Sequence, residues 1–210
     1  MKKLIINADD FGYSEIFNES ILDLIRENFL SSTTVMVSKI TGNQSSQINE
    51  LIEFKNSKNI SVGLHLVFKT DSYYDEIEEQ IEMFMDTFDF FPSHLDVHKS
   101  CGSEAEGMAV EKFCLENDLP CRKSWESLGN VRTTDKKVID GTDIELDDLN
   151  ELLEEMDENN SYEILFHPGT YDPECESSLN KDRELDIEKI KYICLNAEIF
   201  NIKLINFNKL

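Results

Sequence analysis

All four histidines of the chain lie at or near the end of a predicted β-strand, and two adjacent aspartates follow the first predicted strand in the same way. The histidines are His65, His94, His98 and His167, and the aspartates are Asp9 and Asp10. In β/α barrels and open α/β sheets, active sites form outside the carboxyl ends of the strands. We therefore expect a shared site at that edge, although any one of these histidines alone would more often be a surface or hydrogen-bonded core residue.

The first two motifs each leave two uses open. Adjacent carboxylates in extended chain point to opposite sides, so Asp9 and Asp10 would do different jobs unless the pair serves as a turn or a helix N-cap. His65 lies in an otherwise apolar run, where either a metal ion or a backbone carbonyl would satisfy its imidazole. Gly63, two residues earlier, would let another group approach the strand closely.

The later motifs are more regular. Side chains two residues apart share one face of a strand, and this places three polar groups in line: His94, Asp96 and His98. After the strand that precedes His167, the Pro168-Gly169 pair predicts a turn that would hold this histidine at the mouth of the sheet.

The residue types in this set suit metal-assisted hydrolysis. Two imidazoles and one carboxylate with open coordination positions suit Zn²⁺ in a hydrolase, and also non-haem Fe²⁺. A carboxylate outside the ligand set could act as a general base, and a histidine outside it as a general acid. The metal would polarise a carbonyl and hold the attacking water, and the acid would protonate the leaving amine.

Short apolar runs that predict strands alternate with amphipathic stretches that predict helices. Strands are expected at residues 4–7, 33–37, 60–67, 93–98, 120–123, 162–166 and 203–207, with at most a short edge strand at 138–139. Helices are expected at residues 17–28, 45–56, 75–89, 104–117, 145–158 and 182–200. This α/β pattern of about seven βα units predicts a (β/α) barrel or a doubly wound sheet. No linker interrupts residues 1–210, so one domain is expected; a barrel of this size would be trimmed, since full barrels typically take ~250 residues.

The charge of the chain excludes several classes of partner. Lys and Arg number 20 against 43 Asp and Glu, which gives a net charge of −23. Nucleic-acid binding and docking on anionic membranes both need basic clusters, so neither is expected. The segment 135–160 holds much of the acidic excess and is expected to be a solvated helix face. No apolar run is long enough for a signal peptide or a membrane span, and the five cysteines show no CxxC spacing, so we expect reduced thiols in a cytoplasmic protein.

Five motifs, in order along the chain, resemble those of a known family. They are Asn7-Ala-Asp-Asp-Phe-Gly12, Ser31-Ser-Thr-Thr34, Val62-Gly-Leu-His-Leu66, Pro92-Ser-His-Leu-Asp-Val-His98 and Phe166-His-Pro-Gly169. In these motifs the chain is similar to the YdjC-like carbohydrate deacetylases, which include the chitooligosaccharide deacetylases. The resemblance implies a TIM-barrel-like (β/α) barrel, trimmed or distorted here, that removes N-acetyl groups from small acetylated amino sugars. It also implies one divalent metal ion and a possible homodimer.

The resemblance further implies a role for each site residue. The metal ligands would be Asp10, His65 and His98. Asp9 would be the general base, and His167 the general acid or a group that stabilises the transition state. Two more residues would act around them: Arg122 would orient the base or contact substrate, and Asp96 would orient an imidazole, while His94 would support the site or be purely structural. The family's habit points to Mg²⁺, whereas two imidazoles and a carboxylate suit Zn²⁺ on chemical grounds.

Two other functions stay open at this point. The family usually has further histidines after the third ligand, but the run Lys99-Ser-Cys-Gly has none. A sugar-binding or regulatory protein that keeps the metal site is therefore one alternative. A metal-dependent phosphoesterase is a weaker one, because it would normally use two metal ions or cationic clamps, and a charge of −23 repels anionic substrates.

Overall fold

The computed structural model describes residues 1–99, 102–124 and 129–210. All strand pairs in this part are parallel, and the strand order is β4-β3-β2-β1-β6-β5, with β7 also pairing with β1. The strands are β1 (Lys2–Phe11), β2 (Ser32–Val35), β3 (Ser61–Leu66), β4 (Leu95–Val97), β5 (Ile139–Asp140), β6 (Ser161–Phe166) and β7 (Ile202–Ile205). The short edge strand expected at 138–139 corresponds to β5.

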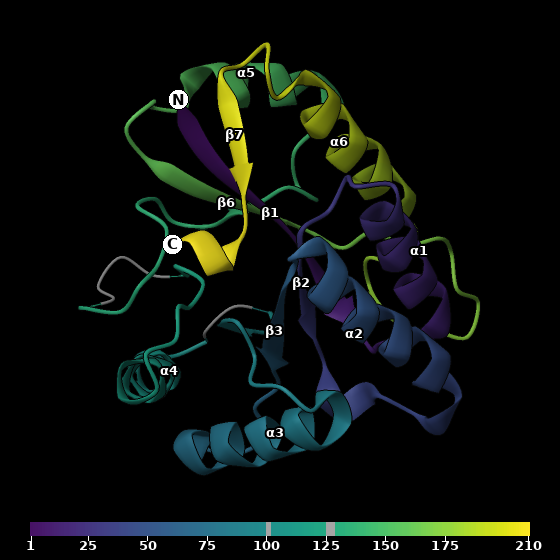
Figure 1. The fold of residues 1–210 in the computed structure, drawn as a ribbon, viewed down its shortest axis with the longest axis vertical. Coiled ribbons are helices and arrows are strands. Elements are labelled where there is room, and N and C mark those ends of the chain that lie inside the picture. The colour runs from purple at the N-terminus through teal and green to yellow at the C-terminus, as the bar shows by residue number, and fades with distance from the viewer. Residues whose placement is uncertain (100–101, 125–128) are drawn as a thin grey trace.

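Helices alternate with the strands and lie around the outside of the curved sheet (Figure 1). They are α1 (Glu15–Arg26), α2 (Ser45–Lys58), α3 (Tyr73–Phe88), α4 (Glu104–Glu116), α5 (Leu149–Glu155) and α6 (Arg183–Asn196). The fold is thus a curled half-barrel of the TIM-like α/β type, distorted as expected, and the doubly wound alternative does not apply. None of the helices in the described ranges combines the length and apolar character needed to cross a membrane.

β1 is the central strand, and two strands, β7 and β2, pair with different parts of the same edge of β1. β7 pairs with the first half of β1, from Lys2 to Ile5, whereas β2 pairs with its end, from Ala8 to Phe11. The register with β2 shifts between Ala8 and Phe11, which marks a bulge or irregularity. β-Bulges commonly re-aim side chains beside active sites. The irregularity contains both aspartates of the first motif.

Alternate side chains point to the two faces of the sheet, and the two faces differ in character. The outward residues of β3 and β6 join the main hydrophobic core beneath the helices: Val62, Leu64, Leu66, Tyr162, Ile164 and Phe166. The residues between them face the inside of the half-barrel: Ser61, Gly63, His65, Ser161, Glu163 and Leu165. A small separate cluster of Ile5, Ile205 and Phe207 packs on the inner side. The polar inner row above this cluster is where the candidate site lies.

Two predicted elements are much shorter in the structure. The helix expected at 145–158 is reduced to α5 with a preceding 3₁₀ turn at Leu146–Asp148. Continuing the helix would place Glu158 one turn after Glu154, and like charges four residues apart are unfavourable; the chain leaves the helical conformation at Met156, where ψ is 132°. The strand expected at 120–123 is a single parallel bridge between Leu95 and Cys121.

Candidate active site

The two adjacent aspartates at the end of β1 point to different groups. Asp10 has a left-handed backbone with φ +70°, a conformation that Asp tolerates better than most residues. Both side chains are buried. Asp9 pairs with Arg122, whereas Asp10 faces His65 and His98. The N-cap alternative does not apply, since Ser14 caps α1.

Asp10, His65 and His98 form a cluster that could hold a metal ion. The Oδ1 atom of Asp10 lies 3.6 Å from His65 Nε2 and 3.6 Å from His98 Nδ1, and the two ring nitrogens are 3.1 Å apart. The ligands of one ion, each bound at about 2.0–2.2 Å, must be this close together. Asp10 Oδ1 is also buried without a hydrogen-bond partner among the described residues, which is costly unless a cation satisfies it. The three residues therefore fit a divalent metal.

Asp96 fixes the orientation of the His65 ring. Its Oδ1 lies 2.7 Å from His65 Nδ1, and because a carboxylate accepts, Nδ1 carries the proton. The other ring nitrogen, Nε2, is then the atom that faces Asp10 and His98. A second carboxylate that orients a ligating imidazole in this way is common around metal sites. Burial lowers the pKa of His65, but the Asp96 and Asp9 carboxylates outweigh burial and raise it to about 9.

Arg122 links three buried carboxylates. Its guanidinium binds Asp9 through Nη1 and Nη2 at 2.7 and 2.6 Å, Asp96 Oδ2 at 2.7 Å, and Glu163 Oε1 through Nε at 2.8 Å. Burial raises the pKa of Asp9, but the Arg122 charge and hydrogen bonds, with His65, bring it far below its usual range. Asn7 and Thr34 also lie within hydrogen-bond distance of Asp9 Oδ1. Asp9 is therefore a rigidly held, ionised carboxylate.

Two residues of this region were not anticipated from the sequence. Glu163 is fully buried, and a lone carboxylate in the apolar run of β6 was the available signal for it. Arg183, at the first position of α6, donates from Nη2 to Asp10 Oδ2 at 2.6 Å and stacks on the Phe17 ring, 3.9 Å from its centroid. An arginine at a helix start, 173 residues away from its partner, carries no signal in the sequence. Arg183 thus holds one oxygen of Asp10, whereas the other, Oδ1, faces the two imidazoles.

His167 reaches the same site from the end of β6. It lines a cavity of about 320 Å³ together with Asp10 and His98, and Tyr13, Asp140 and Glu176 also line it. His167 Nδ1 lies 3.0 Å from the Thr142 hydroxyl. The structure therefore brings a candidate acid into the cavity that contains two of the three candidate metal ligands.

His94 makes its contacts at the inner cluster instead. Its ring stacks on Phe207 with centroids 3.7 Å apart, and Ser93 Oγ lies 2.8 Å from Nδ1. A Cβ on Gly63 would come within 2.5 Å of the His94 ring, so this ring is the group that approaches β3 closely. Burial and the Arg122 charge hold the pKa of His94 well below its usual value, so the ring is neutral. These contacts support the structural alternative for His94.

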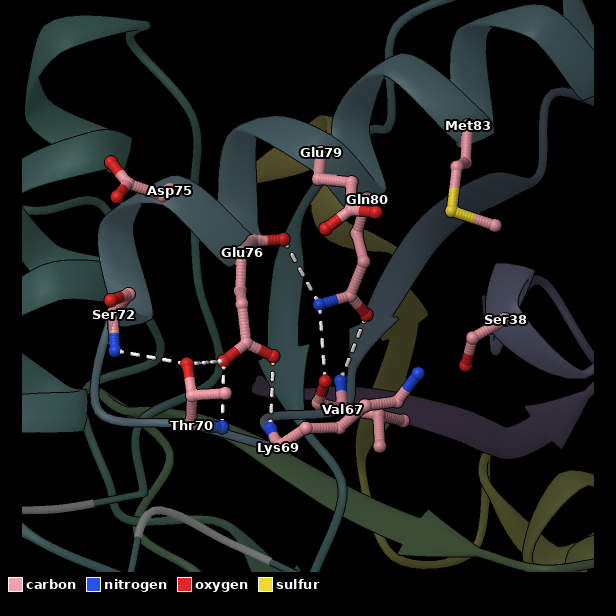
Figure 2. Close-up of a pocket in the computed structure, with 10 residues that line it drawn as sticks. All are labelled: Ser38, Val67, Lys69, Thr70, Ser72, Asp75, Glu76, Glu79, Gln80 and Met83. Carbon is pink, nitrogen blue, oxygen red and sulfur yellow. Dashed lines mark hydrogen bonds between the residues drawn. The ribbon is translucent and has the colours of Figure 1, made fainter.

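A second, larger cavity of about 510 Å³ lies between the end of β3 and α3 (Figure 2). Its polar groups largely bind one another: Gln80 binds both backbone groups of Val67, and Glu76 accepts from the backbone N–H groups of Lys69 and Thr70. None of the candidate site residues lines this cavity. The chemistry expected from the sequence is therefore confined to the half-barrel interior.

Comparison with known proteins agrees with the motifs. The sequence profile of the YdjC-like protein family matches residues 3–73 and 68–192. A carbohydrate deacetylase of Clostridium beijerinckii is 27% identical over 247 residues, covering 98% of both chains. A chitooligosaccharide deacetylase of Yersinia pestis is 26% identical and covers 81% of this chain and 83% of its own. A crystal structure of a protein from Enterococcus faecalis V583 has a TM-score of 0.80 at 20% identity, covers 99% and 98% of the two chains, and supports the fold.

The chain therefore belongs to the YdjC-like protein family, as its motifs predict. Its curated relatives are carbohydrate deacetylases, which are hydrolases.

Proposed function

We propose that this protein is a metal-dependent hydrolase that removes N-acetyl groups from small acetylated amino sugars of the chitooligosaccharide type. The observation that carries the proposal is the cluster of Asp10, His65 and His98, whose buried, unpartnered carboxylate oxygen fits a divalent ion. His167 lines the same cavity, and Asp9 is held by Arg122 beside the cluster. The names of the curated relatives support an acetylated saccharide as the substrate.

The reaction assigns one task to each side chain. Asp10, His65 and His98 would hold one divalent ion, which polarises the acetamide carbonyl and makes water more acidic when it is bound. Asp9 accepts the proton of the attacking water; Arg122 binds both of its oxygens and Asn7 also donates to Oδ1, but Oδ2 keeps a further lone pair that can accept. His167 gives a proton to the departing sugar nitrogen as the C–N bond breaks.

The donor set leaves the choice between Mg²⁺ and Zn²⁺ to experiment. Two imidazoles and one carboxylate suit Zn²⁺ better, because Mg²⁺ prefers oxygen ligands. We would measure acetate release from diacetylchitobiose by metal-stripped protein, and then add Zn²⁺, Mg²⁺, Mn²⁺ or Co²⁺ separately. The proposal expects one or more of these ions to restore release. Absence of release with every ion, despite stoichiometric metal binding, would refute this substrate.

Two variants separate metal binding from proton transfer. Asp9→Asn should keep the metal, because both oxygens of Asp9 bind Arg122 and neither belongs to the cluster of Asp10, His65 and His98, but it should lose about 10²–10⁴-fold in kcat. His65→Ala should lose the metal itself, which metal analysis of the purified protein would detect. An Asp9→Asn protein that releases acetate at the wild-type rate would overturn the role of Asp9.

The same assay distinguishes the alternatives. Binding of an N-acetylated oligosaccharide without acetate release would favour a sugar-binding or regulatory protein. Turnover of a panel of phosphate esters, without turnover of acetamido sugars, would favour a phosphoesterase.

A further inference from the structure

His167 is connected to a buried carboxylate through a hydroxyl group. The Thr142 Oγ1 atom lies 3.0 Å from His167 Nδ1 and 2.7 Å from Asp186 Oδ2. The same Asp186 oxygen accepts the backbone N–H of His167 at 2.9 Å. Thr142 follows β5, His167 follows β6 and Asp186 lies in α6, so three separate elements meet at this point.

The direction of each hydrogen bond follows from what each atom can donate. Asp186 Oδ2 already accepts a backbone N–H, and a carboxylate oxygen has no proton to give to a hydroxyl. The single hydroxyl proton of Thr142 must therefore point to Asp186. Thr142 Oγ1 can then meet His167 only as an acceptor, so Nδ1 of His167 must carry a proton.

We propose that Thr142 and Asp186 are positioning residues that hold His167 in the tautomer protonated at Nδ1, leaving Nε2 as the nitrogen that exchanges protons in the cavity. In the described part of the chain, no protein group hydrogen-bonds Nε2. The assignment of the tautomer is independent of the reaction, but its catalytic consequence rests on the proposed function. During turnover, Nε2 first takes up a proton from solvent, which gives the imidazolium ring, and then passes that proton to the sugar nitrogen as the C–N bond breaks; the ring returns to the neutral form that carries a proton on Nδ1.

The surroundings of Asp186 hold this arrangement in place. Asp186 is fully buried, and Lys189 one turn later in α6 lies 3.4 Å from its Oδ1. The Lys189 ammonium also donates to the backbone carbonyls of Gly141 and Thr142 at 2.9 Å each. Arg183 adds a bond to the carbonyl of His167 at 3.3 Å. The loop that carries Thr142 and the end of β6 are therefore both tied to α6.

The tautomer can be read directly by long-range ¹H–¹⁵N NMR of protein with ¹⁵N-labelled histidine, loaded with diamagnetic Zn²⁺ or Mg²⁺. A His167→Asn variant identifies the His167 signals among those of the four histidines. The neutral His167 ring should show a protonated Nδ1 and an unprotonated Nε2 in the wild-type protein. The opposite tautomer in the wild-type protein would overturn the proposal without any variant.

Variants at Thr142 then test the cause. Thr142→Val keeps the shape but removes the hydroxyl, so the His167 signals should move toward the other tautomer or a mixture, and kcat should fall about 10–100-fold with KM little changed. Thr142→Ser should restore both. Thr87→Val removes an exposed hydroxyl on α3 that bonds only its own helix, and should change neither readout.

The outcomes separate this proposal from the proposed function. Unchanged His167 signals in Thr142→Val would refute the positioning role, whatever the activity. The expected signals in a protein that releases no acetate from any acetamido sugar would instead refute the proposed function and leave the tautomer assignment intact.

Discussion

At the scale of single residues, the interior of the half-barrel contains an excess of buried acids over buried bases. Asp9, Asp96 and Glu163 all bind the one guanidinium of Arg122. The negative charge of Glu163 is the least well compensated of the three, because its Oε2 atom has no hydrogen-bond partner among the described residues. Burial, together with the Asp9 and Asp96 charges, outweighs the attraction of Arg122 and raises the pKa of Glu163 to about 7. Glu163 is therefore the carboxyl of this group that is protonated at neutral to acidic pH.

This makes the effect of Glu163 on stability dependent on pH. Its pKa in the folded protein lies above its ordinary value of 4.5, so the folded state holds the proton longer than the unfolded chain. The resulting stability is fully present below about pH 4.5 and is lost as the pH rises through about 7, by roughly 3 kcal/mol. Glu163→Gln stays neutral and should lack this loss, so its unfolding free energy relative to wild type should rise between these pH values. Urea unfolding across this range measures it.

Glu19→Gln is the matched control, since Glu19 lies on the exposed surface of α1. It should follow the wild-type pH profile. Parallel profiles for Glu163→Gln and wild type would contradict a raised pKa at Glu163.

The sequence predicts the site residues whose type and position at a strand end indicate chemistry. It does not predict the residues that belong to the site only through contacts made in the folded chain. Asp10, His65 and His98 meet because parallel strands bring their carboxyl ends to one edge of the sheet. Arg183 and Asp186 lie in the helix predicted at residues 182–200, where charged residues are ordinarily solvated. No feature of the neighbouring sequence therefore indicates that they are buried beside the site. Their role follows from where α6 docks, which the sequence does not specify.

At the scale of elements, periodicity predicts most helices and strands to within about two residues, but not how β1 is used. The prediction ends this strand at residue 7, because polar residues follow, yet β1 continues to Phe11. Those polar residues are buried inside the half-barrel by hydrogen bonds and ion pairs, which a hydrophobic pattern cannot reveal. The sharing of one β1 edge by β7 and β2 likewise depends on long-range pairing.

The contact between β3 and the start of β4 gives a prediction at this scale. The His94 ring lies where a Cβ on Gly63 would be, at 2.5 Å from its nearest atom. Gly63→Ala should therefore push the two strands apart and destabilise the protein by about 1–3 kcal/mol, as overpacking typically does. Gly42→Ala is the control, because no atom lies within 4 Å of its added Cβ. Equal unfolding free energies for the two variants would contradict this prediction, because they would show that β3 and β4 can move apart without loss of stability.

At the scale of the whole molecule, the fold separates two environments. The main core lies between the sheet and the helices, whereas the interior of the half-barrel is closed by the small cluster of Ile5, Ile205 and Phe207 and is lined mainly by polar side chains. Burying those polar groups is costly unless they pair. The carboxylates pair with Arg122 and Arg183, whereas Asn7, Ser32 and Ser61 hydrogen-bond one another. The main core therefore provides the stability that offsets the cost of burying the polar groups of the site.

The charge of −23 surrounds this site with a field that should select among substrates. A neutral acetamido sugar feels no net force, whereas a phosphorylated one is repelled as it approaches. Screening shortens the Debye length from about 30 Å at 0.01 M salt to about 8 Å at 0.15 M. Between these concentrations, kcat/KM for acetate release should stay constant with diacetylchitobiose and rise several-fold with its 6-phosphate. The neutral sugar controls for effects of salt on the enzyme itself. If the phosphorylated sugar reacted faster at low salt, the local charges of Arg122, Arg183 and Lys99 would outweigh the acidic surface, and an anionic substrate would become the better candidate.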